Sequence, residues 1–243
     1  MSRWNSSTVF VPSPVAAGGA SAGGAPSSSV PTKHPAANSA STSPATRTHR
    51  VVTSCLYPRV ATHMRTPRGV YAVAVDEQGV VLRPATADDL WLFERQAVDP
   101  EAGGTFNWSG FRDIRATRRR LDDNGLITPD GGCLMVTQGG AVVGTVTWTK
   151  VWYGIPIWWC WNIGISLLPD HRGRGIGTLA QQQLVAYLLG TSPAQRVEAY
   201  TDVENVAEQR ALERAGFTRE GVLRATQFRD GRWRDLIIYA VVR

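Results

Sequence analysis

Hydrophobic and polar residues follow a regular pattern only from about Tyr71 to the end of the chain. Alternation with a period of two puts successive side chains on opposite faces of a sheet and predicts strands, whereas apolar residues three or four positions apart predict helices. Strands are expected within 69–86 (two, around a turn at 76–79), 131–151 (a hairpin), 155–168, 196–203 and 227–242 (a hairpin). Helices are expected at 86–98, 112–125, from the turn at 171–178 to about 189, and at 204–217.

Residues with known end preferences mark the limits of the predicted helices. Thr86 precedes two aspartates and suits the first position of a helix, because its hydroxyl can accept a hydrogen bond from a free N–H group. Asn124-Gly125 and Gly216 are expected to end helices, since glycine adopts the left-handed conformation that closes them. Strands that alternate with helices toward the C-terminus predict the α/β class, with a mixed sheet covered by helices.

Composition divides the chain in two. Residues 1–65 are dominated by Ser, Ala, Pro, Thr and Gly, and predict a disordered low-complexity extension, because so few apolar residues cannot offset the entropy of ordering. This extension carries no acidic residue, whereas basic and acidic residues balance over 66–243, so the formal charge of +6 belongs to the extension. Residues 66–243 are long enough for one buried core, and Met64 could be the true start.

Charge and cysteine content exclude several partners. A nucleic-acid-binding role would have to rest on the basic extension, which lacks a binding motif, so no nucleic-acid partner is expected. Cys55, Cys133 and Cys160 are widely spaced and predict no metal site, and they fit a reduced, cytoplasmic setting. The sequence contains no run of 18 apolar residues, so no membrane-spanning helix is expected. Prolines interrupt the apolar stretch near the N-terminus that a signal peptide would need.

The segment HRGRGIGTLAQQQL places three glycines and two arginines directly before a predicted helix. The first N–H groups of a helix have no partner inside it and, with the helix dipole, attract anions. Glycine lets the backbone approach an anion closely, and arginine can form paired hydrogen bonds to a phosphate. The turn therefore predicts a phosphate site, with a plain glycine-rich connection as the alternative.

Three phosphate-binding motifs compete for this turn. A P-loop needs a lysine that the turn lacks, and the dinucleotide motif needs glycine where Thr178 stands. The third motif, Arg-x-x-Gly-x-Gly, is matched by Arg172, Gly175 and Gly177. With its flanks, IGISLLPDHRGRGIGT resembles the fourth strand and coenzyme A loop of the GNAT acetyltransferases, in the branch that acetylates ribosomal-protein N-termini and certain antibiotics.

The C-terminal segment resembles the end of the same branch. The matching positions are Asn205, the Ala215-Gly216-Phe217 turn, Glu220-Gly221, Arg224, the Asp230-Gly231 turn, Asp235 and Tyr239. The resemblance covers about 80–243 and implies a GNAT domain within 66–243, whose sheet splays between its fourth and fifth strands. It also implies acetyl-CoA as co-substrate, direct acyl transfer to an amine, and no metal.

The resemblance also assigns a donor site. The arm of acyl-CoA would hydrogen-bond along the strand edge at Ile165, Ser166 and Leu167, and an N–H group near Ile165 would stabilise the oxyanion. Asn205 would contact the arm, or would merely cap its own helix. The pyrophosphate would lie on the turn, at Arg172, Gly173, Arg174, Gly175, Ile176, Gly177 and Thr178.

Acid–base residues are less defined. Many GNAT enzymes carry a tyrosine where this chain has Leu212 and a glutamate where it has Asn162. Glu198, Tyr200 and Asp202 share one face of a predicted strand. Glu198 or Asp202 could accept the amine proton, and each could equally be structural.

Aromatic residues concentrate in 104–111 and 148–161 and predict a wide aromatic-lined acceptor site. The candidate substrate-binding residues are Phe106, Trp108, Trp152, Trp159 and Tyr200. A homodimer contact is the alternative use of the tryptophan surface. The leading hypothesis is a cytoplasmic N-acetyltransferase acting on a peptide or protein N-terminus or on an amine-bearing secondary metabolite. The alternative is a catalytically silent module of the same fold that senses acyl-CoA.

Overall fold

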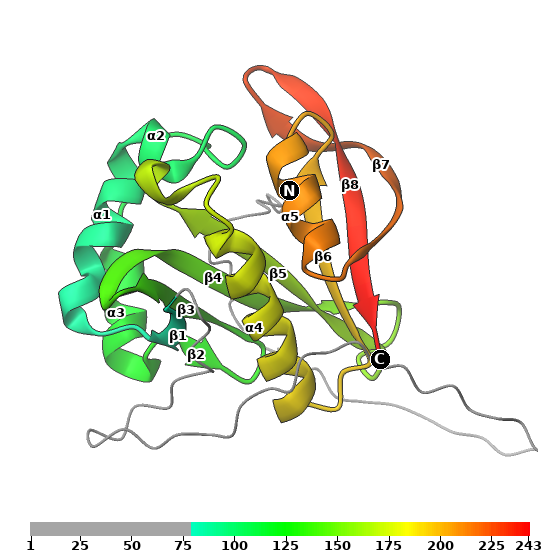
Figure 1. Cartoon of the computed structure of the whole chain (residues 1–243), viewed down its shortest axis with the longest axis horizontal. Helices are drawn as coiled ribbons and strands as arrows, with labels where there is room; N and C mark the ends of the chain where they lie inside the picture. The colour runs from blue at the N-terminus through cyan, green and yellow to red at the C-terminus, as the bar shows by residue number, and fades with distance from the viewer. Residues whose placement is uncertain (1–78) are drawn as a thin grey trace, which may run out of the picture. The chain divides into compact units, whose positions relative to one another are not determined.

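The protein's structure, a computed structural model, describes residues 79–243 (Figure 1). The predicted extension at 1–65 and the strand predicted just before residue 76 lie outside the described residues. One eight-stranded sheet has the order β1-β3-β4-β5-β6-β8-β7, and β2 pairs with β3 off this path. The strands are β1 Val80–Pro84, β2 Ile127–Thr128, β3 Gly131–Gln138, β4 Ala141–Trp152, β5 Trp159–Leu167, β6 Arg196–Asp202, β7 Thr218–Arg229 and β8 Arg232–Val242.

In the described part of the chain, five α-helices accompany this sheet, which confirms the α/β prediction. They are α1 Leu90–Val98, α2 Pro100–Gly103, α3 Arg115–Asn124, α4 Ile176–Thr191 and α5 Val206–Arg214, with 3-10 turns η1 Ala87–Asp89 and η2 Pro169–His171. Short elements escaped prediction: α2 and β2 contain too few residues to show a periodic pattern. Within 79–243, no helix is long and apolar enough to cross a membrane.

The predicted helix ends lie close to the expected residues, but Thr86 caps its helix in a different way. Its hydroxyl donates instead of accepting: the backbone N–H and the hydroxyl of Thr86 both donate to the Asp89 carboxylate, at 2.7 and 3.0 Å, and fix the start of the first helical segment. Gly125 has a φ of +65° and ends α3. The helix that follows the glycine-rich turn begins at Ile176 and runs to Thr191.

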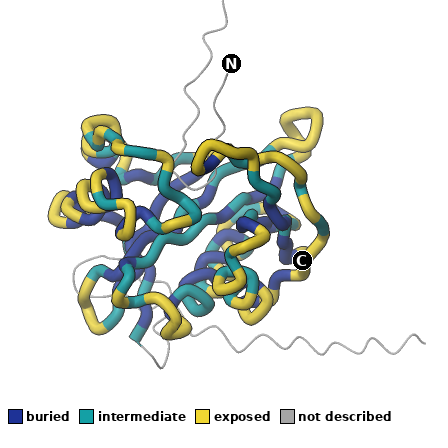
Figure 2. Tube along the Cα trace, turned by 90° about the horizontal axis from the view of Figure 1, so that it is seen from above, coloured by how far each residue is buried: buried dark blue, intermediate teal, exposed yellow. Residues whose placement is uncertain are grey.

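The two faces of the sheet belong to two apolar clusters. Leu134 packs in the cluster that includes Leu184 of α4, whereas its neighbour Met135 packs in the cluster that includes Phe93 of α1. Side chains alternate along a strand, so α4 and α5 cover one face while α1 and α3 cover the other. Figure 2 shows buried positions concentrated along the strands and exposed positions at the turns.

β5 and β6 are parallel neighbours that separate after a short contact. They pair only over Trp161–Ile163 and Val197–Ala199. Beyond Ile163, β5 continues to Leu167 with β4 on its other side, and β6 continues to Asp202 beside β8 (Figure 1). These are the strands predicted as the fourth and fifth, and the extra strand β2 shifts their numbers by one.

Candidate active site

The turn between β5 and α4 presents a run of unpaired backbone donors. Gly173 and Gly175 have φ values of +71° and +81°, which glycine adopts without strain. The N–H group of Leu179 bonds the Gly175 carbonyl at 3.2 Å. The N–H groups of 173–178 form no hydrogen bond with any residue that the structure describes. The turn can therefore offer six consecutive donors to an anion at the positive end of the α4 dipole.

The two arginines of the turn are held differently. Arg172 donates from Nε to the Leu167 carbonyl at 2.9 Å and from Nη2 to the Glu101 carbonyl at 2.8 Å. Its guanidinium thus ties the end of β5 to α2. Arg174 is exposed and reaches only the Asp170 carbonyl, at 3.5 Å. Arg172 therefore holds the turn in place, while Arg174 is the more loosely held cation beside the free donors.

The start of α4 lies against the free end of β5. A Cβ on Gly177 would lie 3.6 Å from the Cδ1 atoms of Ile165 and Leu167, so the helix and the strand are in ordinary contact there. Ile176 is fully buried, and Thr178 places its hydroxyl 3.5 Å from the Ala211 carbonyl of α5. The predicted donor residues of the strand and of the turn therefore lie at one end of the sheet.

Asn205 begins α5 and caps it locally. Its Oδ1 accepts a hydrogen bond from the N–H group of Glu208 at 3.3 Å, as the structural alternative required. The cap uses only the oxygen of the Asn205 amide. A contact from this residue to the coenzyme A arm stays a prediction.

Glu198 is a fully buried hydrogen-bond centre on β6. Its carboxylate accepts hydrogen bonds from the hydroxyls of Tyr153 and Tyr200, each at 2.5 Å, and from Nε of Arg196 at 3.1 Å. Burial and the hydrogen bond to Glu198 raise the pKa of Tyr153 to about 12, and the same causes raise the pKa of Tyr200. Both phenols are thereby kept as donors, and the β4–β5 hairpin is tied to β6.

Asp202, the last residue of β6, forms a buried ion pair with Arg229. Its carboxylate lies 2.8 Å from the Arg229 guanidinium, and the two side chains are 1% and 5% exposed. Arg229 also donates to the Phe106 carbonyl at 3.4 Å and lies 5.1 Å from the centre of the Phe106 ring. This pair therefore connects β6 to the loop at 104–114. Both predicted proton acceptors carry ion pairs, and their catalytic role stays a prediction.

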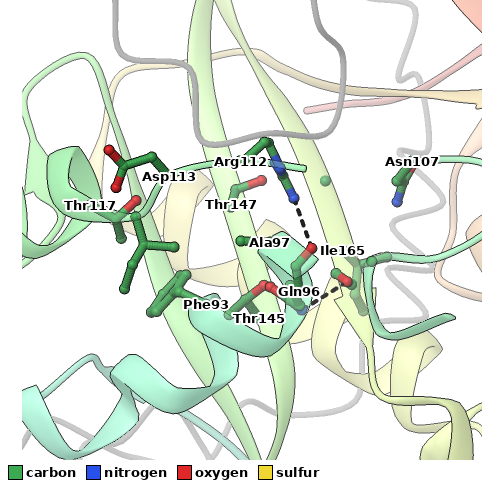
Figure 3. A pocket seen from close by; sticks show the side chains of 14 residues that line it. Phe93, Gln96, Ala97, Asn107, Arg112, Asp113, Thr117, Thr145, Thr147 and Ile165 are labelled. Atoms are coloured by element: carbon green, nitrogen blue, oxygen red, sulfur yellow. Dashed lines mark hydrogen bonds between the residues drawn. The ribbon is translucent and has the colours of Figure 1, made fainter. Parts of the chain in front are cut away.

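A cavity of about 110 Å³ lies on the sheet face that α1 and α3 cover (Figure 3). Its walls come from α1, the loop after α2, the start of α3, and β4 and β5. The lining residues are Phe93, Gln96, Ala97, Gly103, Asn107, Arg112, Asp113, Ile114, Thr117, Thr145, Thr147, Gly164, Ile165 and Ser166. The cavity therefore reaches the end of β5 that has separated from β6.

Polar groups of this cavity are linked by hydrogen bonds. Gln96 is buried, and its Nε2 donates to the Ser166 hydroxyl at 3.0 Å. Arg112 Nη2 donates to the Gln96 carbonyl at 3.3 Å (Figure 3). Sequence reasoning missed Gln96, Arg112, Thr145 and Thr147. The signal for the threonines was present in VVGTVTWTK, where they alternate on a central strand and give it one polar face.

The five aromatic residues predicted to bind the acceptor do not line this cavity. Phe106 lies beside Arg229, and Trp108 packs against Gly103 and edge-on to Phe111, with ring centres 5.7 Å apart. Trp152 and Trp159 face each other across β4 and β5, and Tyr200 is bonded to Glu198. Polar and apolar groups line the cavity in similar measure. Acceptor contacts by these aromatic side chains stay predictions.

The chain matches a protein-family model described as an acetyltransferase (GNAT) domain over residues 80–218, more than half of its length. It is 35% identical over 80 residues to YjcK of Bacillus subtilis, a probable N-acetyltransferase; the match covers 33% of this chain and 44% of that protein. The chain thus spans less than half the length of the Bacillus subtilis relatives that it matches.

Two solved structures show the same architecture. One is an acetyltransferase from Salmonella typhimurium that modifies the N-terminal serine of ribosomal protein L7/L12, with a TM-score of 0.59, 19% identity, and coverage of 71% of this chain and 99% of that one. The other is spermidine N-acetyltransferase from Vibrio cholerae with CoA and spermine, with a TM-score of 0.59, 16% identity, and coverage of 69% and 96%. At these identities the likeness concerns the fold alone.

Proposed function

Because the chain belongs to the GNAT acetyltransferase family, we propose that it transfers an acetyl group from acetyl-CoA directly to the primary amine of an acceptor. One observation carries this proposal. The free N–H groups of 173–178 and the separated end of β5 lie together, and the cavity opens onto that strand end. The proposed phosphate site, strand edge and acceptor cavity would thus share the end of β5.

The donor would be held by backbone groups more than by side chains. Its pyrophosphate would accept hydrogen bonds from the N–H groups of the turn, with Arg174 as a nearby cation. Its arm would add to the free edge of β5 at Ile165–Leu167. One N–H group of that edge would bind the developing oxyanion, which stabilises the transition state in a site that excludes most water.

The reaction would need no covalent enzyme intermediate. The neutral amine attacks the thioester carbon, a C–N bond forms, the C–S bond breaks, and the nitrogen loses one proton. Ser166 accepts a hydrogen bond from Gln96, so its own hydrogen is free to be donated to the departing sulfur.

Asp202 is the better placed of the two candidate proton acceptors. It lies on the part of β6 that has separated from β5, whereas Glu198 lies within the paired part and accepts three hydrogen bonds. A proton could reach the Asp202 carboxylate through one water molecule.

The acceptor would be a peptide or protein N-terminus, or an amine-bearing secondary metabolite, in the cytoplasm. Two enzymes of similar fold act on the N-terminal serine of a ribosomal protein and on spermidine. The direct test is release of the coenzyme A thiol from acetyl-CoA by the full chain with a panel of primary amines, with the acetylated product confirmed by mass spectrometry.

A second candidate function is a silent acyl-CoA sensor. It is favoured by Leu212, which is fully buried in the apolar core where many family members carry a tyrosine. Asn162, at the position of a common glutamate, only donates to the Glu198 carbonyl at 3.4 Å. Tight coenzyme A binding without thiol release for any amine would favour the sensor over the enzyme.

A further inference from the structure

Among the described residues that line the cavity, Arg112 is the one with a basic side chain. It follows the loop at 104–111, and its guanidinium reaches the Gln96 carbonyl of α1 at 3.3 Å. Gln96 in turn bonds Ser166 on the free end of β5. Two hydrogen bonds thus connect the Arg112 guanidinium to the end of β5, where the thioester is expected. The wall of the proposed acceptor cavity therefore carries a positive charge.

Asp113, the acidic residue among the described residues that line the cavity, is hydrogen-bonded to Arg115. The Asp113 carboxylate accepts hydrogen bonds from the backbone N–H of Arg115 at 2.8 Å and from its Nε at 2.5 Å, and its side chain is 53% exposed. In Figure 3 it points away from the Arg112 guanidinium. The remaining polar residues that the structure describes in the lining are neutral: Gln96, Asn107, Thr117, Thr145, Thr147 and Ser166. Within 79–243, the wall therefore offers no array of carboxylates to a polyamine.

The size of the cavity limits the group that it can enclose. One water molecule needs roughly 10–15 Å³ of such space, so a cavity of about 110 Å³ holds on the order of eight water-sized groups. That volume suits the amine, α-carbon and carbonyl of one amino-acid residue. An extended polyamine would leave most of its length and charge outside.

We propose that the cavity selects primary amines that carry a carboxylate or a carbonyl one carbon away from the nitrogen, and that Arg112 binds that oxygen. A guanidinium binds such oxygens through fixed parallel donors, and it repels a second ammonium group. A free amino acid and a chain N-terminus share this chemistry. The proposal rests on the proposed function for the position of the reacting amine.

The test is equilibrium binding by calorimetry to the full chain loaded with coenzyme A. The probes are L-alanine, L-alaninamide, ethylamine and spermidine, of which ethylamine is alanine without its carboxylate. A charge-assisted hydrogen bond predicts that L-alanine binds about tenfold or more tightly than ethylamine, and spermidine no more tightly than ethylamine. Tighter binding of alanine than of alaninamide identifies a free amino acid as the acceptor, and the reverse identifies a chain N-terminus.

Variants make the assignment specific to one side chain. Arg112→Gln should reduce the preference for the oxygen-bearing probes over ethylamine to about twofold or less, and Arg112→Lys should retain part of it. Arg118→Gln removes a nearby exposed cation that pairs with Glu94, and because neither residue lines the cavity it should change nothing.

Equal binding of all four probes by the unaltered protein, or a preference that survives Arg112→Gln, would overturn the proposal. Thiol release is measured separately. Its absence with every amine would contradict the proposed transferase, while the binding series would still decide the role of Arg112.

Discussion

The donor and acceptor sides of the candidate site are built from different kinds of structure. The donor side is one continuous piece of chain, in which the end of β5, the glycine-rich turn and the first turn of α4 follow each other directly. The acceptor cavity draws on α1, a loop, α3, β4 and β5. The donor side presents backbone N–H groups, whereas the acceptor side presents side chains.

This difference predicts how the two sides respond to change. Backbone donors depend on the conformation of the turn and tolerate many side chains outside the glycine positions. A cavity assembled from distant segments depends on the contacts that hold those segments together. Substitutions in the glycine-rich turn should therefore mainly alter coenzyme A affinity, and substitutions of side chains that line or support the cavity, Ser166 included, should alter acceptor KM or kcat.

The largest effect is expected for Gly175→Glu. Gly175 has a φ of +81°, so any other residue is strained there, and a carboxylate would repel the pyrophosphate. The Kd for coenzyme A should rise about 1,000-fold, equivalent to ~4 kcal/mol. Gly175→Asn is the matched control, because asparagine tolerates this conformation without adding charge, and it should raise Kd by about tenfold or less. Unchanged affinity in a folded Gly175→Glu protein would make the turn a mere connection.

Arg229→Met tests the acceptor side through its buried ion pair. Removing the guanidinium leaves the Asp202 carboxylate buried without its cation, which should lower the free energy of unfolding by about 3 kcal/mol. The loop carrying Phe106 loses the same partner, so the acceptor KM should rise while the Kd for coenzyme A stays unchanged. Denaturant unfolding and steady-state kinetics measure both effects.

Arg118→Met is the control for that substitution. Arg118 pairs with Glu94 at 3.0 Å, both side chains are about half exposed, and an exposed pair contributes about 1 kcal/mol or less. Equal losses of stability in the two variants would show that burial of the Asp202 pair has no special effect.

The buried carboxyl of Glu208, on α5, leads us to expect that the free energy of unfolding depends on pH. Burial between α4 and α5 raises the pKa of this carboxyl from 4.5 to about 7, although Gln181 donates a hydrogen bond to it. Between these values the folded protein holds a proton that the unfolded chain has lost, so stability should fall as pH rises from about 4.5 to 7. Partial exposure limits the loss to about 2 kcal/mol. Glu208→Gln should abolish the slope in urea midpoints measured across this range.

The smallest effect is expected for Gln96→Leu. Without the Gln96 amide, the Ser166 hydroxyl is free to rotate, and kcat should fall about tenfold, or ~1.4 kcal/mol, with no change in coenzyme A affinity. Ser166→Ala should have a similar effect, and the double variant should be no worse than either single one. Additive losses would show that the two residues act independently.

The strand end, the turn and the helix start on the proposed donor side could be predicted because their determinants are local. The glycines of the turn, the start of α4 and the free strand edge occupy adjacent positions, and a short pattern of residue types specifies them. The structure adds the hydrogen bonds of Arg172, which depend on where α2 lies. No pattern of residue types could show that this arginine holds two segments together.

The cavity resisted prediction because its contacts are long-range. Gln96 and Ser166 are 70 residues apart in the sequence and meet only because α1 packs on the face of β5. The tryptophans suggested an aromatic site, but a large apolar side chain serves a core equally well. Trp148 and Trp161 are each 5% exposed and belong to the main apolar cluster.

Arg172 also connects the two sides of the candidate site through its hydrogen bonds. One guanidinium is bonded to the strand that leads into the donor turn and to the helix that precedes the acceptor loop. A phosphate that draws this side chain toward the turn would compete with its hydrogen bond to α2. Binding of one substrate would then change the affinity of the site for the other. The order in which the two substrates bind is therefore a property that a single side chain can set.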